Sequence, residues 1–142
     1  MRNKTIVVGC GRLGASIASY ASSQGESVIV LDAKKESFVK LSDTFSGYTI
    51  ACDATEVDEL EDAGIADARE LILTTGDDNV NLYLAHLCLA KYNIPYIYVR
   101  FDDPEKGYLI QGMPIKAIYP FQLSRDRFSM LQQGQEQGED EQ

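Results

Sequence analysis

The stretch at residues 5–18, TIVVGCGRLGASIA, decides the fold of this 142-residue chain. Its opening residues predict a buried strand, its closing residues predict the start of a helix, and glycines at positions 9, 11 and 14 lie between them. Glycines in this spacing allow a tight turn, a close approach of the backbone to a pyrophosphate, and close packing of the helix on the strand. The turn therefore predicts a phosphate site at a helix N-terminus. The alternative is that the glycines only form a tight turn.

An acidic residue completes this pattern. Residues 27–31, SVIVL, predict the next strand, which ends in Asp32, roughly 20 residues beyond the glycines. In dinucleotide-binding folds, an acid at this place accepts hydrogen bonds from the ribose hydroxyls. We therefore predict nucleotide binding. Asp32 disfavours NADP because it repels a 2′-phosphate, an effect that Lys34 and Lys35 weaken.

The rest of the chain alternates between strand and helix patterns. Strands are predicted over residues 48–52, 71–75, 96–100 and 115–118, and helices over 34–45, 55–63, 79–92, 104–111 and from 120 onward. Thr55 is predicted to cap the helix over 55–63, Gly64 to end it, and Asp77 or Asp78 to cap the helix over 79–92. Strands and helices alternating at this spacing require right-handed crossovers. The predicted fold class is α/β: a Rossmann-like, doubly wound, six-stranded parallel sheet with a C-terminal crossover-type helix that projects toward another subunit or a second domain.

Length and charge limit the possible functions. We expect one nucleotide-binding domain over residues 1–133 and a disordered acidic tail over 134–142, which lacks apolar residues. The formal net charge of −9 and the pI near 4.5 argue against nucleic-acid binding. No stretch reaches the ~20 apolar residues of a membrane span, and the first residues lack a signal-peptide core. We therefore expect a cytoplasmic protein without direct membrane insertion.

The sequence contains few of the residues that catalysis or metal binding would need. Cys10, Cys52 and Cys88 lack the number and spacing of a disulfide or zinc framework. Cys10 lies beside a predicted helix N-terminus, which either lowers the pKa of its thiol and makes it redox-sensitive or leaves it a small residue in a tight turn. His86, the only histidine, falls in the middle of the helix over 79–92. With neither a catalytic nor a metal-binding set, the sequence does not predict an enzyme.

The carboxyl ends of the predicted strands carry the candidate site, because ligands of doubly wound sheets bind there. Asp53 either accepts a hydrogen bond from a base amino group or caps a turn. Thr74, Thr75 and Gly76 either contact the ribose and phosphates or serve the geometry of a turn. The candidate nucleotide-binding residues are Gly9, Cys10, Gly11, Arg12, Leu13, Gly14, Asp32, Ala33, Lys34, Cys52, Asp53, Ala54, Thr74, Thr75, Gly76, Asp77, Asn79 and Arg100.

Two arginines bear on the charge of the ligand. Arg12, in the glycine turn, and Arg100, at the end of a strand, are predicted to neutralise phosphates. Alternatively, Arg100 pairs with Asp102 or Asp103 at the surface. The phosphate contacts favour ATP or ADP over AMP.

Four segments of the chain carry a family resemblance: IVVGCGRLGASIA, VIVLD, ACDATEVDELEDAGIADARELILTTGDDNVNLYLA and VRFDDPE. Through them, residues 4–132 resemble the N-terminal domain of the regulators of potassium conductance (RCK, TrkA-N), the family of the Trk and Ktr uptake regulators. The resemblance implies a regulatory subunit that binds ATP/ADP or NAD(H), with AMP as a further candidate. It also implies dimers or octameric rings on a membrane potassium transporter or channel subunit, at the inner face of the cell membrane.

The resemblance also assigns roles to residues by position. It implies that Gly9, Gly11, Arg12 and Gly14 contact phosphates, that Asp32 contacts ribose, that Asp53 and Ala54 contact adenine, and that Arg100 contacts the phosphate end or a neighbouring subunit. Relatives usually carry a second, smaller ligand-binding domain after the final helix, where this sequence stops. The competing hypotheses are the cofactor domain of an NAD-dependent oxidoreductase and a redox-sensing regulator of another membrane transporter.

Overall fold

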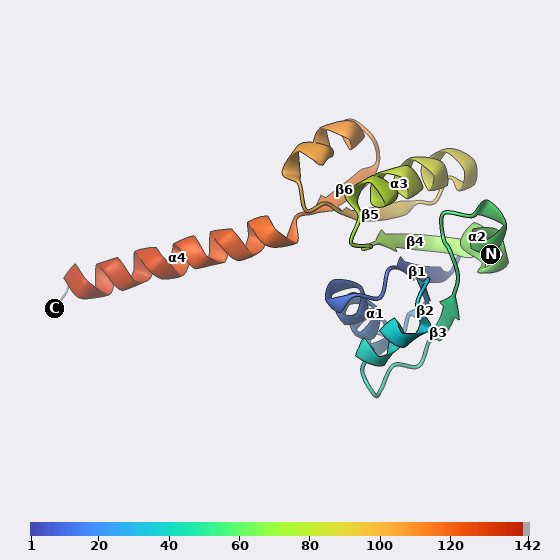
Figure 1. Ribbon diagram of the computed structural model, residues 1–142, viewed down its shortest axis with the longest axis horizontal. Coiled ribbons are helices and arrows are strands. Elements are labelled where there is room, and N and C mark those ends of the chain that lie inside the picture. The colour runs from blue at the N-terminus through green and yellow to red at the C-terminus, as the bar shows by residue number, and fades with distance from the viewer. Residues whose placement is uncertain (141–142) are drawn as a thin grey trace.

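A six-stranded parallel sheet in the order β3-β2-β1-β4-β5-β6 forms the centre of the fold (Figure 1). The computed structural model describes residues 1–140, with side chains described to residue 135. This is the predicted Rossmann-like order, which changes direction between β1 and β4 and opens a crevice at their carboxyl ends. The strands are β1 (Lys4–Val8), β2 (Ser27–Asp32), β3 (Tyr48–Ala51), β4 (Ala68–Leu73), β5 (Tyr96–Arg100) and β6 (Ile115–Ile118).

Helices cover the two faces of the sheet. α1 (Arg12–Ser23) packs on one face, while α2 (Val57–Asp62) and α3 (Asp78–Tyr92) pack on the other. Successive residues of a strand point to opposite faces, so Val7 packs with Ala18 of α1, whereas Val8 lies in the cluster that contains Leu84 of α3. Because both faces are covered, the side chains of the central strands are apolar along nearly the whole strand, and polar side chains occur at the strand ends.

The last helix, α4 (Pro120–Asp140), leaves the sheet and projects away from it, as the sequence predicts (Figure 1). Its apolar side chains Leu123, Phe128 and Leu131 are exposed. The helix continues through residues 134–140, for which the composition predicts disorder. The division of the chain at residue 133 remains a prediction, and residues 141–142 of the predicted tail lie outside the described part. No helix of the described residues combines the length and apolarity needed to cross a membrane.

Two predicted α-helices are shorter 3₁₀ helices in the structure. The segment at 34–45 contains only η1 (Lys35–Lys40), and the segment at 104–111 contains η3 (Pro104–Ile110). A third 3₁₀ turn is η2 (Ile65–Asp67). After η1, the Ser42 hydroxyl lies 3.0 Å from that of Thr44, and the Ser42 N–H donates to Ser19 Oγ at 3.1 Å. Such polar contacts compete with helical hydrogen bonds, which the apolar spacing of this segment does not reveal.

Candidate functional site

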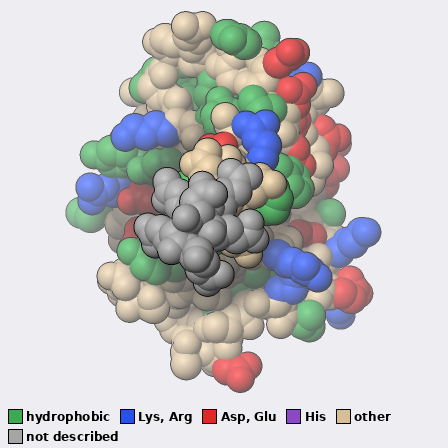
Figure 2. All heavy atoms as spheres, turned by 90° about the vertical axis from the view of Figure 1, so that its left-hand side faces the viewer, with side chains coloured by type: hydrophobic (Ala, Val, Ile, Leu, Met, Phe, Trp, Pro, Cys, Tyr) green, Lys and Arg blue, Asp and Glu red, His purple; other side chains and the backbone are tan. Residues whose placement is uncertain are grey.

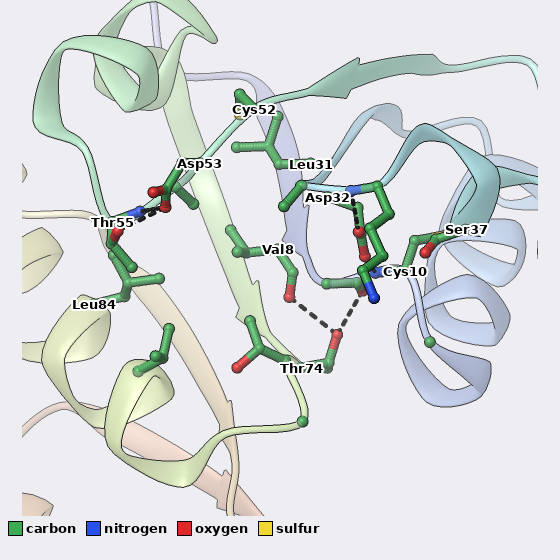
Figure 3. A pocket seen from close by; sticks show the side chains of 18 of the residues that line it. Val8, Cys10, Leu31, Asp32, Ser37, Cys52, Asp53, Thr55, Thr74 and Leu84 are labelled. Atoms are coloured by element: carbon green, nitrogen blue, oxygen red, sulfur yellow. Dashed lines mark hydrogen bonds between the residues drawn. The ribbon is translucent and has the colours of Figure 1, made fainter.

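A cavity of about 450 Å³ lies at the carboxyl ends of the strands, where the sequence predicts the ligand (Figure 3). Its walls come from the turn after β1, the end of β2 with η1, the segment after β3, the turn after β4, and Arg100 of β5. This volume falls within the roughly 300–1,000 Å³ that is usual for small-molecule and cofactor sites. The topology thus brings residues distant in sequence to one cavity at the switch point of the sheet.

The glycine turn forms the floor of the cavity, and each glycine has a different physical role. Gly9 has φ +98°, a left-handed conformation that favours glycine, and a Cβ there would lie 2.8 Å from the backbone of Thr74 and Thr75. At Gly14, a Cβ would lie 1.9 Å from the Gly9 carbonyl oxygen, so this glycine lets α1 pack against the turn. At Gly11, an added Cβ would meet no atom within 4 Å, so its backbone is open to a ligand.

The N-terminus of α1 lies at this turn and is suited to an anion. Gly11 is its N-cap, no side chain caps the free N–H groups, and no acidic residue lies in the first turn. By contrast, the side chain of Asp77 caps α3 as predicted, accepting hydrogen bonds from the N–H groups of Asn79 and Val80. The free N–H groups and the positive end of the α1 dipole therefore remain available to a phosphate.

Asp32 is fixed beside the glycine turn. Its Oδ2 accepts a hydrogen bond from the Cys10 N–H at 2.8 Å, and its Oδ1 accepts one from the Lys34 N–H, also at 2.8 Å (Figure 3). A carboxylate oxygen has two lone pairs, so each oxygen of Asp32 can accept a further hydrogen bond. The acid is therefore held in place with acceptor capacity left for a pair of ribose hydroxyls.

Asp53 forms the opposite wall, after β3. Its Oδ1 accepts from the Thr55 N–H at 3.0 Å and from the Thr55 hydroxyl at 2.6 Å, and these hydrogen bonds lower the pKa of the Asp53 carboxyl (Figure 3). This is the turn geometry that the sequence leaves open as an alternative role for Asp53. The prediction that Thr55 caps α2 is wrong, because Glu56 is the N-cap and Thr55 instead bonds to Asp53.

Asn81 of α3, which is fully buried, holds the ends of β4 and β5 together. Its Oδ1 accepts from the Thr75 N–H and hydroxyl at 3.1 and 2.6 Å, and its Nδ2 donates to the carbonyl oxygens of Thr75 and Arg100 at 3.0 and 2.9 Å. The hydroxyl of buried Thr74 lies 2.9 Å from the Gly9 carbonyl oxygen and 3.2 Å from that of Val8. These bonds order the turn after β4 against the glycine turn.

Cations balance the acids in the cavity wall. Lys34, Lys40 and Arg100 contribute three positive charges, against two carboxylates from Asp32 and Asp53. The wall is therefore less negative than the chain as a whole, whose formal net charge is −9, and this balance favours an anion there. Arg100 also forms the pair that the sequence leaves open as an alternative, since its Nε lies 2.9 Å from Asp102 Oδ1.

The cysteine thiols of the cavity are not activated. Burial, and then the charge of Asp32, raise the pKa of the Cys10 thiol, although Lys40 acts in the opposite sense. The pKa of the Cys52 thiol is also raised, by burial and by the carboxylates of Glu59, Asp53 and Asp32. The reading in which the helix N-terminus lowers the pKa of Cys10 is therefore wrong.

Thirteen of the eighteen candidate residues line this cavity. They are Gly9, Cys10, Gly11, Asp32, Ala33, Lys34, Cys52, Asp53, Ala54, Thr74, Thr75, Gly76 and Arg100. Of the other five, Arg12 lines a neighbouring groove on α1, Leu13 and Gly14 lie in the first turn of α1, Asp77 caps α3, and Asn79 accepts a hydrogen bond from Lys106 at 3.0 Å. Lys40 lines both the cavity and the groove with Arg12.

The site prediction omits seven wall residues: Val8, Leu31, Ser37, Lys40, Thr55, Val80 and Leu84. Val8 and Leu31 directly precede Gly9 and Asp32, and Val80 and Leu84 are spaced by one turn of α3, so sequence position could have indicated these four. Ser37 and Lys40 are three residues apart in η1, so they lie on the same face of this 3₁₀ helix and both reach the wall.

His86 lies outside the site. Its Nε2 is 3.1 Å from the carbonyl oxygen of Leu109, and it lines a separate surface groove with Tyr83 and Leu87. In the part of the chain that the structure describes, no group of three or more His, Cys, Asp or Glu side chains is arranged to hold a metal ion.

Comparison with known proteins identifies the family. A family model described as the TrkA-N domain matches residues 5–120. The Trk system potassium uptake protein TrkA of Streptomyces coelicolor is 26% identical over 86% of this chain and 55% of its own length. The TrkA homolog of Pyrococcus horikoshii is 33% identical over 80% of this chain and 50% of its own length. The chain thus spans about half the length of these curated relatives.

Solved structures share the fold. The RCK domain of GsuK has a TM-score of 0.80 at 22% identity and covers 95% of this chain and 29% of its own. The GsuK channel bound to NAD has a TM-score of 0.80 at 22% identity and covers 94% of this chain and 24% of its own. GsuK bound to ADP has a TM-score of 0.76 at 22% identity and covers 92% of this chain and 34% of its own. The family match over residues 5–120, with the six-stranded parallel sheet and its glycine turn, confirms the resemblance found in the sequence: the chain belongs to the TrkA-N domain family, the N-terminal domain of the regulators of potassium conductance.

Proposed function

We propose that this chain is a nucleotide-binding regulatory module that controls a membrane potassium transporter or channel in response to ATP/ADP or NAD(H). The observation that carries the proposal is the cavity in which Asp32 is tied to the glycine turn at an uncapped helix N-terminus. That juxtaposition offers acceptors for a ribose and donors for phosphates within one site.

The cavity supports a definite orientation for the ligand. The ribose lies at Asp32, the phosphates lie over Gly9 and Gly11, and the base lies toward Ala54 and the apolar side chains of Val80 and Leu84. The phosphate end then extends toward Thr75 and Arg100.

The cationic wall favours ligands with two or more phosphates over AMP, and Asp32 disfavours NADP. Structures of GsuK, which shares this fold, hold ADP or NAD, which supports both leading candidates.

Control of transport, rather than catalysis, is the role we assign to the site. The described cavity wall carries no histidine and no thiol of lowered pKa, and its two carboxylates are engaged in hydrogen bonds with the backbone. Ligand binding changes the activity of a partner only if the two arrangements of the assembly bind the ligand with different affinity. The nucleotide is therefore proposed as a signal and not as a substrate.

The proposed partner is a potassium-transporting membrane subunit, because the curated relatives are named as Trk potassium uptake proteins. The proposed location is the cytoplasmic face of the membrane, reached through that partner. The exposed apolar residues of α4 support self-association into at least a dimer. The octameric ring is proposed from the family resemblance alone.

Reconstitution tests the proposal. The protein is placed with the potassium transporter encoded beside it in vesicles, and potassium flux is measured without nucleotide and with ATP, ADP, NAD or NADH. We expect flux to depend on the nucleotide in the wild type, to lose that dependence in Asp32→Ala, and to keep it in Asp58→Ala, a control at an exposed acid of α2. Equal flux with and without the protein under every nucleotide would overturn the regulatory role.

A further inference from the structure

Arg100 lies at a junction between the cavity and the base of α4. We infer that its guanidinium exchanges Asp102 for a phosphate of the bound nucleotide, and that this exchange releases Phe121 and so changes the direction of α4. The inference rests on the proposed function, since it takes the phosphate from the nucleotide. It adds a route by which the occupied cavity acts on the projecting helix.

Three neighbours surround the Arg100 side chain. It lines the cavity, its Nε donates to Asp102 Oδ1 at 2.9 Å, and an Nη donates to Asp102 Oδ2 at 3.3 Å. Its Cζ lies 5.9 Å from the centroid of the Phe121 ring, within the range of a cation–π contact. Phe121 is the second residue of α4. One side chain therefore touches the cavity, the β5–η3 loop and the projecting helix.

The backbone around Arg100 is fixed, which confines the exchange to its side chain. Buried Asn81 donates to the Arg100 carbonyl oxygen at 2.9 Å. The carboxylate of Asp78, at the start of α3, accepts from the N–H groups of Asp102 and Asp103 at 2.8 and 2.9 Å. Both flanks of the junction are thus tied to α3, and the long guanidinium side chain is the part that is free to change partner.

The strengths of the competing contacts favour the exchange. The side chains of Arg100 and Asp102 are 18% and 35% exposed, and a partly exposed ion pair of this kind changes an equilibrium by only ~1.5- to 5-fold. A terminal phosphate offers the same guanidinium two acceptor oxygens, as Asp102 does, but carries more negative charge. A nucleotide with its phosphate end at β5 therefore outcompetes Asp102.

The consequence for α4 follows from where that helix begins. α4 starts directly after β6 and projects from the sheet, so contacts in its first turn set its direction (Figure 1). Figure 2 looks at the side from which α4 projects and shows hydrophobic side chains there, with acidic and basic ones among them. Loss of the Arg100 contact frees the exposed ring of Phe121, and a small change at the base becomes a large displacement at the far end.

A single fluorophore at the junction tests the exchange. The chain contains no tryptophan, so Phe121→Trp introduces the only indole, placed against the guanidinium. We expect ATP and ADP to shift its emission to longer wavelength as the guanidinium leaves and water replaces it, and adenosine, which has no phosphate, to leave it unchanged. The matched control Tyr20→Trp, at a similarly exposed aromatic position on α1 that neither lines the cavity nor belongs to α4, should show no shift that follows the phosphate number.

Two pairs of variants in the Phe121→Trp background identify the exchange. Arg100→Gln should abolish the shift while the protein stays folded by circular dichroism, and Arg100→Lys, which keeps the charge but not the bidentate geometry, should give a reduced shift. Asp102→Asn should bind ATP ~2- to 5-fold more tightly because Arg100 is no longer held. Asp103→Asn is the control, since it removes the same charge from the same loop and an asparagine can still accept from the Glu105 N–H.

Calorimetry on the same samples separates the possible outcomes. ATP binding without any emission shift, or an equal gain in affinity for Asp102→Asn and Asp103→Asn, would overturn the exchange and leave the proposed function intact. If no nucleotide binds to the wild type, the proposed function and the exchange both fail.

Discussion

Asp32 Oδ2 accepts a hydrogen bond from the Cys10 N–H at 2.8 Å, so the acid that ends β2 is joined directly to the glycine turn that follows β1. A ribose-binding group and a phosphate-binding turn are thereby held in one fixed arrangement. Since each sets the position of the other, a change at Asp32 affects both the binding site and the stability of the turn.

Replacing Asp32 should weaken nucleotide binding strongly. Asp32→Ala removes charge-assisted hydrogen bonds to the ribose, worth about 1.5–3 kcal/mol, or roughly 10- to 150-fold in Kd. Asp32→Asn keeps one carbonyl oxygen and should bind with intermediate affinity. Isothermal titration with ADP and NAD measures the affinity of both variants. In Asp32→Ala the N–H groups of Cys10 and Lys34 lose their acceptor, which destabilises the turn, so the titration is run below the unfolding temperature of the variant. Wild-type affinity in Asp32→Ala would contradict the ribose assignment.

Two glycines of the turn should respond differently to substitution. Gly11 has φ −78° and ψ −167°, which valine also adopts, and its Cβ direction is open, so Gly11→Val should fold with a near-native melting temperature but fail to bind nucleotide. Gly14→Ala places a Cβ 1.9 Å from the Gly9 carbonyl oxygen and should lose at least ~1–3 kcal/mol of folding stability. Thermal unfolding with and without ADP distinguishes the two, and ADP stabilisation of Gly11→Val equal to wild type would refute the phosphate site.

The strand and turn predictions succeed where the signal is local. The apolar runs, the glycine spacing and the acid after β2 are each local in sequence, and together they predict the Rossmann-like sheet order, with the crossover rule fixing only its handedness. The role of Asn81 is not predictable in this way, because its four hydrogen bonds join Thr75 to Arg100, 25 positions apart in the chain. Lys40 escapes prediction for a related reason: it reaches the cavity wall from η1, and no local motif marks which face of that segment turns toward the cavity.

The number of phosphates should set the order of affinity. ATP and ADP should bind more tightly than AMP, and the difference should shrink from about 0.05 M to about 0.5 M NaCl as exposed charges are screened. Lys40→Gln should reduce the ATP-to-AMP affinity ratio by ~2- to 5-fold. Lys35→Gln is the matched control, since Lys35 is exposed on η1 but does not line the cavity. Equal affinities for ATP and AMP in the wild type at low salt would exclude the cationic wall as a phosphate site.

Cys52 should report occupancy of the cavity through its reaction with a thiol reagent. Burial, and then Glu59, Asp53 and Asp32, raise the pKa of its thiol, so little thiolate exists at neutral pH. Labelling should accelerate about tenfold for each pH unit below that pKa, because the thiolate is the reacting form. Saturating ADP should slow the reaction, since Cys52 lines the cavity.

Mass spectrometry after labelling assigns the modified cysteine. Cys52→Ser should remove the signal that ADP protects. Cys88 lies in the core, and burial raises the pKa of its thiol to about 12, so it should stay unlabelled in the folded protein. A labelling rate at Cys52 that saturating ATP, ADP and NAD all leave unchanged would place the ligand elsewhere.

The projecting helix should make the protein an oligomer. Leu123, Phe128 and Leu131 of α4 are 62%, 63% and 53% exposed, more apolar surface than an isolated helix retains in water without a partner. Light scattering at micromolar concentration should give at least twice the chain mass of 15.7 kDa.

The double variant Phe128→Glu with Leu131→Glu should shift the mass toward one chain and keep the melting temperature of the sheet domain, because neither side chain packs in its core. Arg125→Gln, an exposed position on the same helix, should leave the mass unchanged. If the wild type has the mass of one chain at every concentration, with and without nucleotide, these residues are not an interface between copies of this chain, and α4 must act through a different partner.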